Sequence, residues 1–159
     1  MEPSHQRFDS NADYEAALDQ VISCARRSLR IFDKTLSREY NSVRRYELLR
    51  GFLLASRGNR LLIAVHHAEA IRRDCPRLVN LLHQFSHAIS VHRTLPAAKR
   101  AYDPFMLADE EHYAHRFHYD QPGSVLSLGD LAGGRELYER FEEIWEASTP
   151  AVTATTLGL

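Results

Sequence analysis

Residues 61–65, Leu-Leu-Ile-Ala-Val, form a continuous apolar run that is bounded by Arg60 and His66. A run of this kind is typical of a strand that is covered on both faces. We therefore expect it at the centre of a β-sheet. Gly58-Asn59, just before the run, ends the preceding helical segment.

Helical and extended patterns alternate on both sides of this strand. Helices are predicted from Ser10 or Asn11 to about Arg27, over residues 42–56, and from Pro76 onward. Strands are predicted over residues 29–32 and 88–92. This alternation indicates an α/β layer with parallel neighbouring strands. In the second helix we expect Val43, Tyr46, Leu49, Phe52 and Leu53 to face inward, and Arg44, Arg45 and Arg50 to face outward.

The pattern changes after residue 101. Residues 105–108, the turn-like residues 109–111 and the aromatic-rich residues 112–119 predict an antiparallel hairpin, and residues 124–128 predict one more strand. A last helix is expected to begin after Gly129-Asp130. The predicted fold class is α/β, with a mixed β-sheet flanked by helices on both faces. Residues 1–10 are interpreted as a leader, residues 11–147 as a single domain and residues 148–159 as a flexible tail.

The composition is that of an ordinary globular domain: 159 residues, 44% hydrophobic, 26% charged, with a formal net charge of -1. No apolar run is long enough to cross a membrane, and no signal peptide is recognisable. Cys24 and Cys75 are the two cysteines and have no C-x-x-C spacing. We therefore expect a cytoplasmic protein without a membrane partner.

The charge is distributed unevenly. Residues 1–100 contain 17 Lys and Arg against 10 Asp and Glu, whereas residues 101–159 contain 3 against 11. The pattern favours internal neutralisation or a self-complementary dimer, and the alternative is a basic face kept for an anionic ligand. The arginine-rich second helix lacks interleaved exposed aromatic residues, so nucleic acid is not the expected partner.

Two histidine patterns are candidate sites. His112, His115 and His118 are spaced by three residues, but on a strand the first and last lie roughly 20 Å apart and the middle one faces away. They are not expected to share a metal ion. His66 and His67 end the predicted central strand and point in opposite directions, so one of the two could enter a pocket at the sheet edge. No P-loop, G-x-S-x-G or G-x-G-x-x-G motif is present.

The order of elements resembles one half of a phospholipase D-like domain over about residues 12–147. The resemblance rests on three features. These are the apolar strand, the hairpin with an aspartate near its tip, and the last helix, which contains Arg-Phe-Glu-Glu-Ile-Trp-Glu at residues 140–146. That superfamily carries H-x-K-x-x-x-x-D, followed after six residues by G-S-x-N. Alignment on Asp109 places the histidine at Tyr102, the lysine at Pro104 and the G-S-x-N segment at residues 116–119. The aspartate alone is retained.

The resemblance implies a reaction in which one histidine attacks phosphorus, a second histidine protonates the leaving group, and lysine and asparagine hold the phosphoryl oxygens. Proline offers neither charge nor donor. A phenol such as that of Tyr102 would need a strong activator to attack phosphorus, and the missing cation makes this harder. We therefore expect no catalytic residue, no cofactor, no metal and no enzymatic activity of the family's kind.

A ligand could still bind at this position. On a strand over residues 112–119, His112, Arg116 and His118 would share a face, and Arg116 would lie where the family holds its phosphate. The alternative is a structural ion pair between Arg116 and Asp109 or Asp103. The candidate ligand-binding residues are Tyr102, Asp109, Arg116, His118, His112 and His66.

A closer resemblance is to an uncharacterised bacterial domain that occurs alone or attached to GNAT-type acetyltransferases. That domain likewise retains only part of the phospholipase D-like motif. In it an aspartate is followed seven residues later by an arginine, and the corresponding residues here are Asp109 and Arg116. The resemblance implies a GNAT-type acetyltransferase as a possible protein partner. It implies no acetyltransferase activity for this chain, which has no R/Q-x-x-G-x-G/A loop.

Active members of the phospholipase D-like superfamily combine two halves, so the resemblance implies a homodimer. The expected role is recognition of an anionic small molecule, a phosphorylated group or a protein partner, with regulation of an associated enzyme. One alternative is a phosphodiesterase or nuclease in which His112 or His118 supplies acid-base chemistry and Arg116 holds phosphate. The other is a structural module with no pocket ligand.

Overall fold

The computed structural model describes residues 2–152, which form one eight-stranded mixed sheet with helices on both faces. The predicted fold class is confirmed. The strands are β1 (Ser4–Phe8), β2 (Ser28–Asp33), β3 (Arg60–Val65), β4 (Ile89–Thr94), β5 (Phe105–Ala108), β6 (His112–Arg116), β7 (Ser124–Leu128) and β8 (Ser148–Val152). The helices are α1 (Asn11–Cys24), α2 (Val43–Ala55), α3 (Ile71–Asp74), α4 (Pro76–Gln84) and α5 (Leu131–Glu146), with 3-10 turns η1 (Arg38–Asn41) and η2 (Pro96–Ala98).

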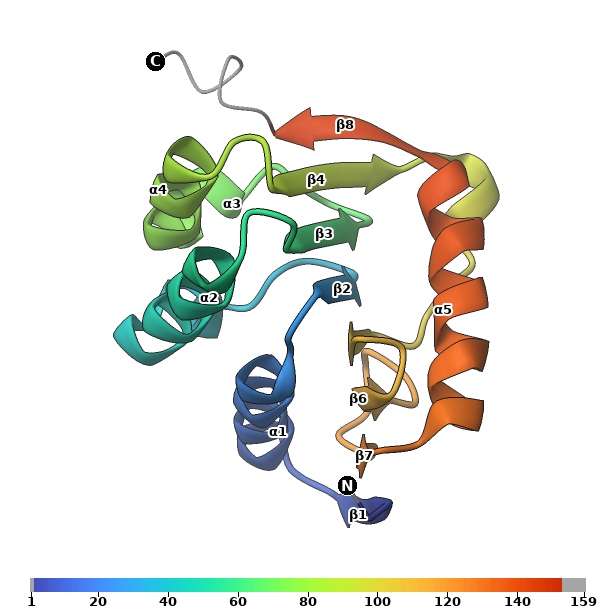
Figure 1. Cartoon of the computed structure of the whole chain (residues 1–159). Helices are drawn as coiled ribbons and strands as arrows, with labels where there is room; N and C mark the ends of the chain where they lie inside the picture. The colour runs from blue at the N-terminus through green and yellow to red at the C-terminus, as the bar shows by residue number, and fades with distance from the viewer. Residues whose placement is uncertain (1, 153–159) are drawn as a thin grey trace.

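The strands lie in the order β1-β7-β6-β5-β2-β3-β4-β8. β2, β3 and β4 are parallel, and the other neighbouring pairs are antiparallel. Helices α1, α2 and α4 cover one face of the sheet, and α5 lies on the other face (Figure 1). Because β5 runs against β2, the start of β5 lies beside the carboxyl end of β2.

The helices begin where the capping residues predict. Ser10 accepts a hydrogen bond from the Asp13 N–H at 3.1 Å, and Ser42 accepts one from the Arg45 N–H at 3.1 Å. Asp130 caps α5 by accepting from the Gly133 N–H at 3.0 Å. Pro76 stands in the first turn of α4, where its missing N–H leaves no helical bond unmade.

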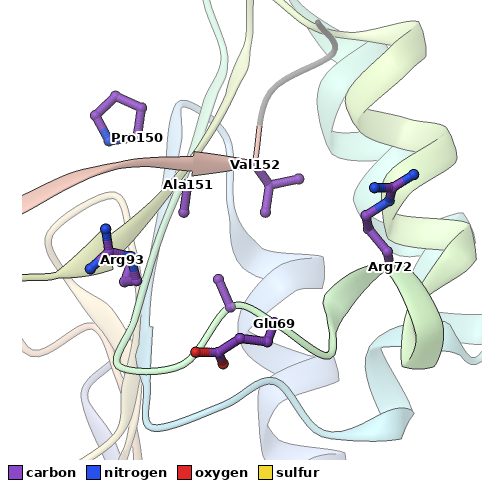
Figure 2. A pocket seen from close by; sticks show the side chains of 7 residues that line it. Glu69, Arg72, Arg93, Pro150, Ala151 and Val152 are labelled. Carbon is purple, nitrogen blue, oxygen red and sulfur yellow. The ribbon is translucent and has the colours of Figure 1, made fainter. Parts of the chain in front are cut away.

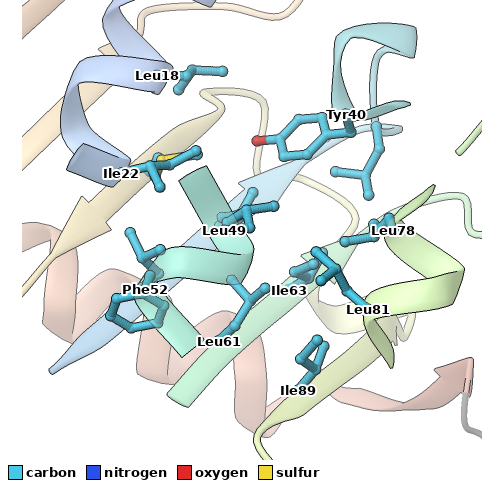
Figure 3. Packing of buried hydrophobic residues seen from close by; sticks show 14 of the residues in the cluster. Leu18, Ile22, Tyr40, Leu49, Phe52, Leu61, Ile63, Leu78, Leu81 and Ile89 are labelled. Carbon is cyan, nitrogen blue, oxygen red and sulfur yellow. The ribbon is translucent and has the colours of Figure 1, made fainter. Parts of the chain in front are cut away.

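The apolar run at residues 61–65 forms β3 and is covered on both faces, as predicted. Leu61 and Ile63 pack with Leu49 of α2 and Leu81 of α4 (Figure 3), whereas Ala64 belongs to the smaller apolar layer under α5. β3 is not the centre of the sheet, however. It is the third strand from one edge, because β8 adds an edge strand beyond β4 and four strands lie on the other side of β2.

Two edge strands were not predicted. Residues 4–8, expected in a leader, form β1 and pair with β7, and residues 148–152, expected in a flexible tail, form β8 and pair with β4. Both segments lack a clear apolar alternation because an edge strand is held largely by backbone hydrogen bonds. Pro150 is tolerated for the same reason, since an edge strand has one side free of pairing. Residues 153–159 of the predicted tail lie outside the described residues.

Two predictions for α2 are wrong. Arg45 does not face solvent: its residue exposure is 1%, and Val43, expected inside, is 58% exposed. The Arg45 guanidinium is drawn inward by acidic groups on α1, donating from Nε to Asp19 Oδ1 at 2.8 Å and from Nη1 to Glu15 Oε1 at 2.9 Å. A helical period alone does not reveal such partners.

The predicted strand over residues 112–119 is shorter in the structure. β6 ends at Arg116, and residues 117–123 form the connection to β7. His118 therefore lies in a loop and not on the strand. Within residues 2–152, no helix has the length and apolar character that a membrane crossing requires.

Candidate functional site

The predicted ligand-binding residues lie at two opposite ends of the sheet. Tyr102, Arg116 and His118 lie where β2 and β6 end and where the chain approaches β5. Together with Asp33 and Lys34, which were not predicted as site residues, they are called the end cluster. The other group, Asp109 and His112, lies at the hairpin between β5 and β6.

A single row across the sheet orders the end cluster. Phe32 pairs with Phe105, and Phe105 pairs with His115. One residue further along each strand, the same pairing places Pro104 between Asp33 and Arg116. In agreement with this, the Arg116 N–H donates a hydrogen bond to the Pro104 carbonyl at 2.8 Å. Side chains alternate along strands, so these three residues lie on the face covered by α1. Pro104 thus lies in the middle of a row whose two outer residues, Asp33 and Arg116, have ionisable side chains.

Arg116 is anchored but carries no ion pair within residues 2–152. Its Nε donates to the Gln121 carbonyl at 2.6 Å, and its Cζ lies 6.0 Å from the centre of the Tyr14 ring. Neither ion pair that the sequence suggested as an alternative forms. Asp103 and Asp109, the two possible partners, are engaged elsewhere.

Asp103 belongs to a network on the α5 face. It accepts from Arg140 of α5, and it pairs with Nε2 of His115 at 2.8 Å. Hydrogen bonds from His115 and Arg140 lower the pKa of the Asp103 carboxyl against the opposing effect of burial. This network ties the segment before β5 to α5.

Asp33 was not predicted as a site residue. It is partly buried, and its Oδ1 accepts the Lys34 N–H at 2.7 Å. Burial raises the pKa of its carboxyl to about 7, and the negative charge of Glu15 acts in the same direction. The Lys34 N–H and Arg116 oppose this rise. The available signal is a carboxylate directly after the predicted strand over residues 29–32.

Tyr102 and His118 are brought together in the end cluster. Their rings stack with centroids 5.2 Å apart at 29°, and Tyr102 is 50% exposed. The Tyr119 N–H donates to the Tyr102 carbonyl at 2.9 Å, which holds the two segments side by side. The Lys34 ammonium lies 4.7 Å from the centre of the Tyr119 ring. Aromatic faces and two cations therefore occupy one end of the sheet.

His66 is buried, and both of its ring nitrogens have partners. Nδ1 lies 2.6 Å from Thr94 Oγ1, and Nε2 lies 2.7 Å from the Ala101 carbonyl. Burial lowers the pKa of the imidazole. His66 therefore braces the segment that leads into Tyr102 and has no nitrogen left for a ligand.

Asp109 and His112 serve the backbone at the other end. The Asp109 carboxylate accepts from the N–H groups of Arg26, Arg27 and Ser28 at 2.7, 2.8 and 3.0 Å. His112 accepts the Gly129 N–H on Nδ1 at 2.9 Å. The structure does not bring these two residues to Tyr102 or Arg116.

Open cavities lie beside the sheet within residues 2–152, and two of them have two arginines each on their walls. One, of about 350 Å³, lies between η2 and α5 and has Tyr102, Arg100 and Arg140 on its wall. The other, of about 380 Å³, lies against β8 with Arg72 and Arg93 on its wall (Figure 2). The first borders the end cluster through Tyr102. Within the described residues, no three His, Cys, Asp or Glu side chains gather in a way that could hold a metal ion.

The fold is similar to solved structures of the phospholipase D family. Nuc from Salmonella typhimurium, described as a phospholipase D family member, aligns with a TM-score of 0.67 and 13% identity over 96% of this chain and 100% of its own. NucT from Helicobacter pylori aligns with a TM-score of 0.65 and 14% identity over 94% and 100%. TrmBL2, an archaeal chromatin protein, aligns with a TM-score of 0.68 and 9% identity over 92% of this chain and 54% of its own.

Sequence comparison gives the family. No curated protein matches the chain. Residues 10–157 match the family described as Domain of unknown function (DUF7931). With a phospholipase D-like fold and a match over nearly its whole length, the chain belongs to the DUF7931 family.

Proposed function

We propose that this domain binds a phosphorylated, anionic ligand at the end cluster without cleaving it. The observation that carries the proposal is the state of Arg116. Its Nε is fixed by the Gln121 carbonyl, it is partly exposed, and its charge has no carboxylate partner within residues 2–152. A guanidinium held in this way presents two terminal nitrogens to an oxyanion.

The surroundings of Arg116 favour an anion. Lys34, at the end of β2, also forms no ion pair in the described part of the chain. The Asp33 carboxyl, whose pKa is raised to about 7, is only partly charged at neutral pH and cancels these cations incompletely. The net field at the end cluster is therefore positive.

The absence of cleavage follows from the residue types. The sequence alignment on Asp109 matches Tyr102 and Pro104 to the attacking histidine and the lysine of the phospholipase D-like motif. An electrostatic clamp and a nucleophile each supply several kcal/mol of transition-state stabilisation, so losing both is expected to abolish turnover. The His118 imidazole is stacked on Tyr102 and accepts the Asp120 N–H on Nδ1 at 3.0 Å.

The proposal includes an assembly. Because the phospholipase D-like superfamily combines two halves, two copies of this chain are expected to associate, and ligand binding would regulate a protein partner such as a GNAT-type acetyltransferase. The two free cysteines, Cys24 and the buried Cys75, are compatible with the cytoplasm that we propose as its location. Light scattering at several concentrations tests the assembly separately from binding.

Binding is tested by calorimetry with inorganic phosphate and phenyl phosphate. Arg116→Ala is expected to weaken both by at least tenfold, whereas Arg135→Ala, at an exposed arginine of α5, should leave them unchanged. Equal affinities in the wild type and Arg116→Ala would refute the site. Turnover of bis(p-nitrophenyl) phosphate that disappears in Arg116→Ala or His118→Ala would replace the proposal with the hydrolytic alternative.

A further inference from the structure

We propose that the cavity against β8 binds a free acidic α-amino acid. Arg72 and Arg93 hold its two carboxylates, and Glu69 holds its ammonium group. The cavity has a volume of about 380 Å³, and its wall, as far as residues 2–152 form it, contains no residue of the end cluster. The inference therefore stands independently of the proposed function.

The cavity lies at the carboxyl ends of two parallel strands. Arg93, near the end of β4, pairs with Val65 at the end of β3. The segment between β3 and α3 contributes Ala68 and Glu69 to the wall, and α3 contributes Arg72. In open α/β sheets, ligands bind outside the carboxyl ends of the strands. The cavity opens at this end of the sheet.

A β-bulge in β8 shapes the apolar part of the wall. Val91 of β4 pairs with Val152, but the next residue, His92, pairs with Pro150, so Ala151 has no partner on β4. All three of these β8 residues line the cavity. Bulges bend a strand and redirect its side chains, and they are over-represented next to active sites. The edge strand is thus irregular where it borders the cavity.

Three charged side chains line the rest of the wall. Figure 2 shows Arg93 and Arg72 on opposite sides of the cavity, with Glu69 between them. All three residues are exposed, and within residues 2–152 none of them forms an ion pair. Arg73, the neighbour of Arg72, differs because its Nε pairs with Asp74 Oδ1 at 2.9 Å. The charges on the cavity wall are therefore free to contact a ligand.

These charges are complementary to those of an acidic α-amino acid. Two guanidinium groups and one carboxylate leave the wall with one positive charge in excess. Aspartate and glutamate carry two carboxylates and one ammonium group at neutral pH, so they have one negative charge in excess. A guanidinium binds a carboxylate through two parallel hydrogen bonds, and an ammonium group donates to a carboxylate. The methylene groups of the ligand would lie against the apolar wall of β8.

Other small ligands match the wall less well. A dicarboxylate without an amino group would be repelled by Glu69, and a neutral amino acid would leave one arginine without a partner. A residue inside a peptide has neither a free carboxylate nor a free ammonium group on its Cα. The complete set of three charges on one small molecule therefore specifies a free acidic amino acid.

Isothermal titration calorimetry of the wild type tests the ligand class. L-Glutamate and L-aspartate are titrated first, and the tighter ligand is compared with three analogues that each lack one charge. For L-glutamate these are L-glutamine, 4-aminobutyrate and glutarate; for L-aspartate they are L-asparagine, β-alanine and succinate. Each analogue is expected to bind at least about tenfold more weakly, because it lacks one charge-assisted contact. No binding of either amino acid, or equal affinity for the dicarboxylate, would overturn the proposal.

Three variants at exposed side chains test the assigned contacts. Glu69→Gln should weaken amino-acid binding by about tenfold and abolish the preference over the dicarboxylate. Arg72→Gln and Arg93→Gln should each weaken it by about tenfold, and each should abolish the preference over one of the two analogues that lack a carboxylate. Arg73→Gln is the matched control on α3 and should bind as the wild type does.

Arg116→Ala separates this site from the end cluster. This variant should bind the acidic amino acid as the wild type does, although its binding of phenyl phosphate is weakened. Loss of amino-acid binding in Arg116→Ala, or unchanged affinity in the three cavity variants, would place the amino acid elsewhere and overturn the inference. A wild-type protein that binds the amino acid but not phenyl phosphate would refute the proposed function alone.

Discussion

Asp109 and Arg116 lie at opposite ends of β6. Four residue steps separate His112, next to the hairpin that holds Asp109, from Arg116, a distance of about 13 Å along an extended strand. Asp109, the position that the sequence alignment matches to the motif aspartate, is therefore a scaffold position that fixes the connection between α1 and β2. Tyr102, Pro104 and Arg116, which that alignment sets against other motif positions, lie at the end proposed to bind the ligand.

This arrangement predicts that Asp109 contributes to stability and not to binding. Asp109→Ala would leave three backbone N–H groups, those of Arg26, Arg27 and Ser28, without their acceptor. It also places alanine at a positive φ of 54°. We expect the free energy of unfolding in urea to fall by about 2–4 kcal/mol.

Asp109→Asn is the matched variant, because asparagine tolerates a positive φ and keeps one acceptor oxygen. It should lose less stability than Asp109→Ala. Under conditions where both variants are folded, phenyl phosphate affinity should equal that of the wild type. A selective loss of affinity at full stability would place Asp109 in the binding site after all.

The interior elements were predictable because apolar period and caps act locally. The run at residues 61–65, the cap at Ser42 and the proline at Pro76 each specify an element without reference to the rest of the chain. The hairpin over residues 105–116 was predictable for the same reason. The two edge strands were not, because their pairing partners are distant in sequence and their side chains bury little apolar surface.

The site was predictable only in part. Tyr102, Arg116 and His118 were proposed from the motif alignment and the strand pattern, and the structure brings Tyr102 and His118 into contact. The raised pKa of Asp33 depends on burial, and its place in one row with Arg116 depends on strand pairing. No local sequence pattern contains either. The motif alignment also grouped Asp109 with Arg116, although strand geometry separates them.

Asp33 is expected to make the free energy of unfolding depend on pH. The pKa of its carboxyl is raised in the folded state, from 3.8 to about 7, so the folded protein binds a proton that the unfolded chain releases. The stabilisation is fully present below about pH 4 and is lost as pH rises through about 7. The stability of Asp33→Asn relative to the wild type should therefore increase from pH 4 to pH 7 and stay constant above.

Relative to the wild type, the free energy of unfolding of Asp33→Asn is expected to be about 2 kcal/mol larger at pH 7.5 than at pH 4.5. This figure allows for solvent screening at a partly exposed group. Urea denaturation of both proteins at pH 4.5, 6.0 and 7.5 measures it. Asp120→Asn, whose carboxyl is 70% exposed, serves as the control and should show no such trend. A constant difference between Asp33→Asn and the wild type across this range would contradict the raised pKa.

Arg45 is expected to be a major determinant of stability. It joins α2 to α1 through Glu15 and Asp19, and its guanidinium lies over the Tyr40 ring with Cζ 4.4 Å from the centre. Arg45→Ala would leave two carboxylates without their buried partner, at a cost of about 3–5 kcal/mol. Arg44→Ala, at a side chain that is 76% exposed and pairs with Asp19 at 3.3 Å, should cost less than about 1 kcal/mol. Similar losses in the two variants would show that burial of Arg45 is not what matters.

Two glycines in helices provide a matched test of the packing between α5 and the β5–β6 hairpin. A Cβ on Gly134 would overlap the Glu110 carbonyl, whereas a Cβ on Gly51 of α2 would meet nothing within 4 Å. Glu110 has little freedom to withdraw, because it lies at φ 61° beside Asp109 in a tight turn.

Gly134→Ala should therefore lower the free energy of unfolding by about 2–3 kcal/mol. Gly51→Ala should raise it by up to about 1 kcal/mol through helix propensity. Urea denaturation of both variants distinguishes the two effects, and a stabilised Gly134→Ala protein would mean that α5 does not rest on the hairpin tip.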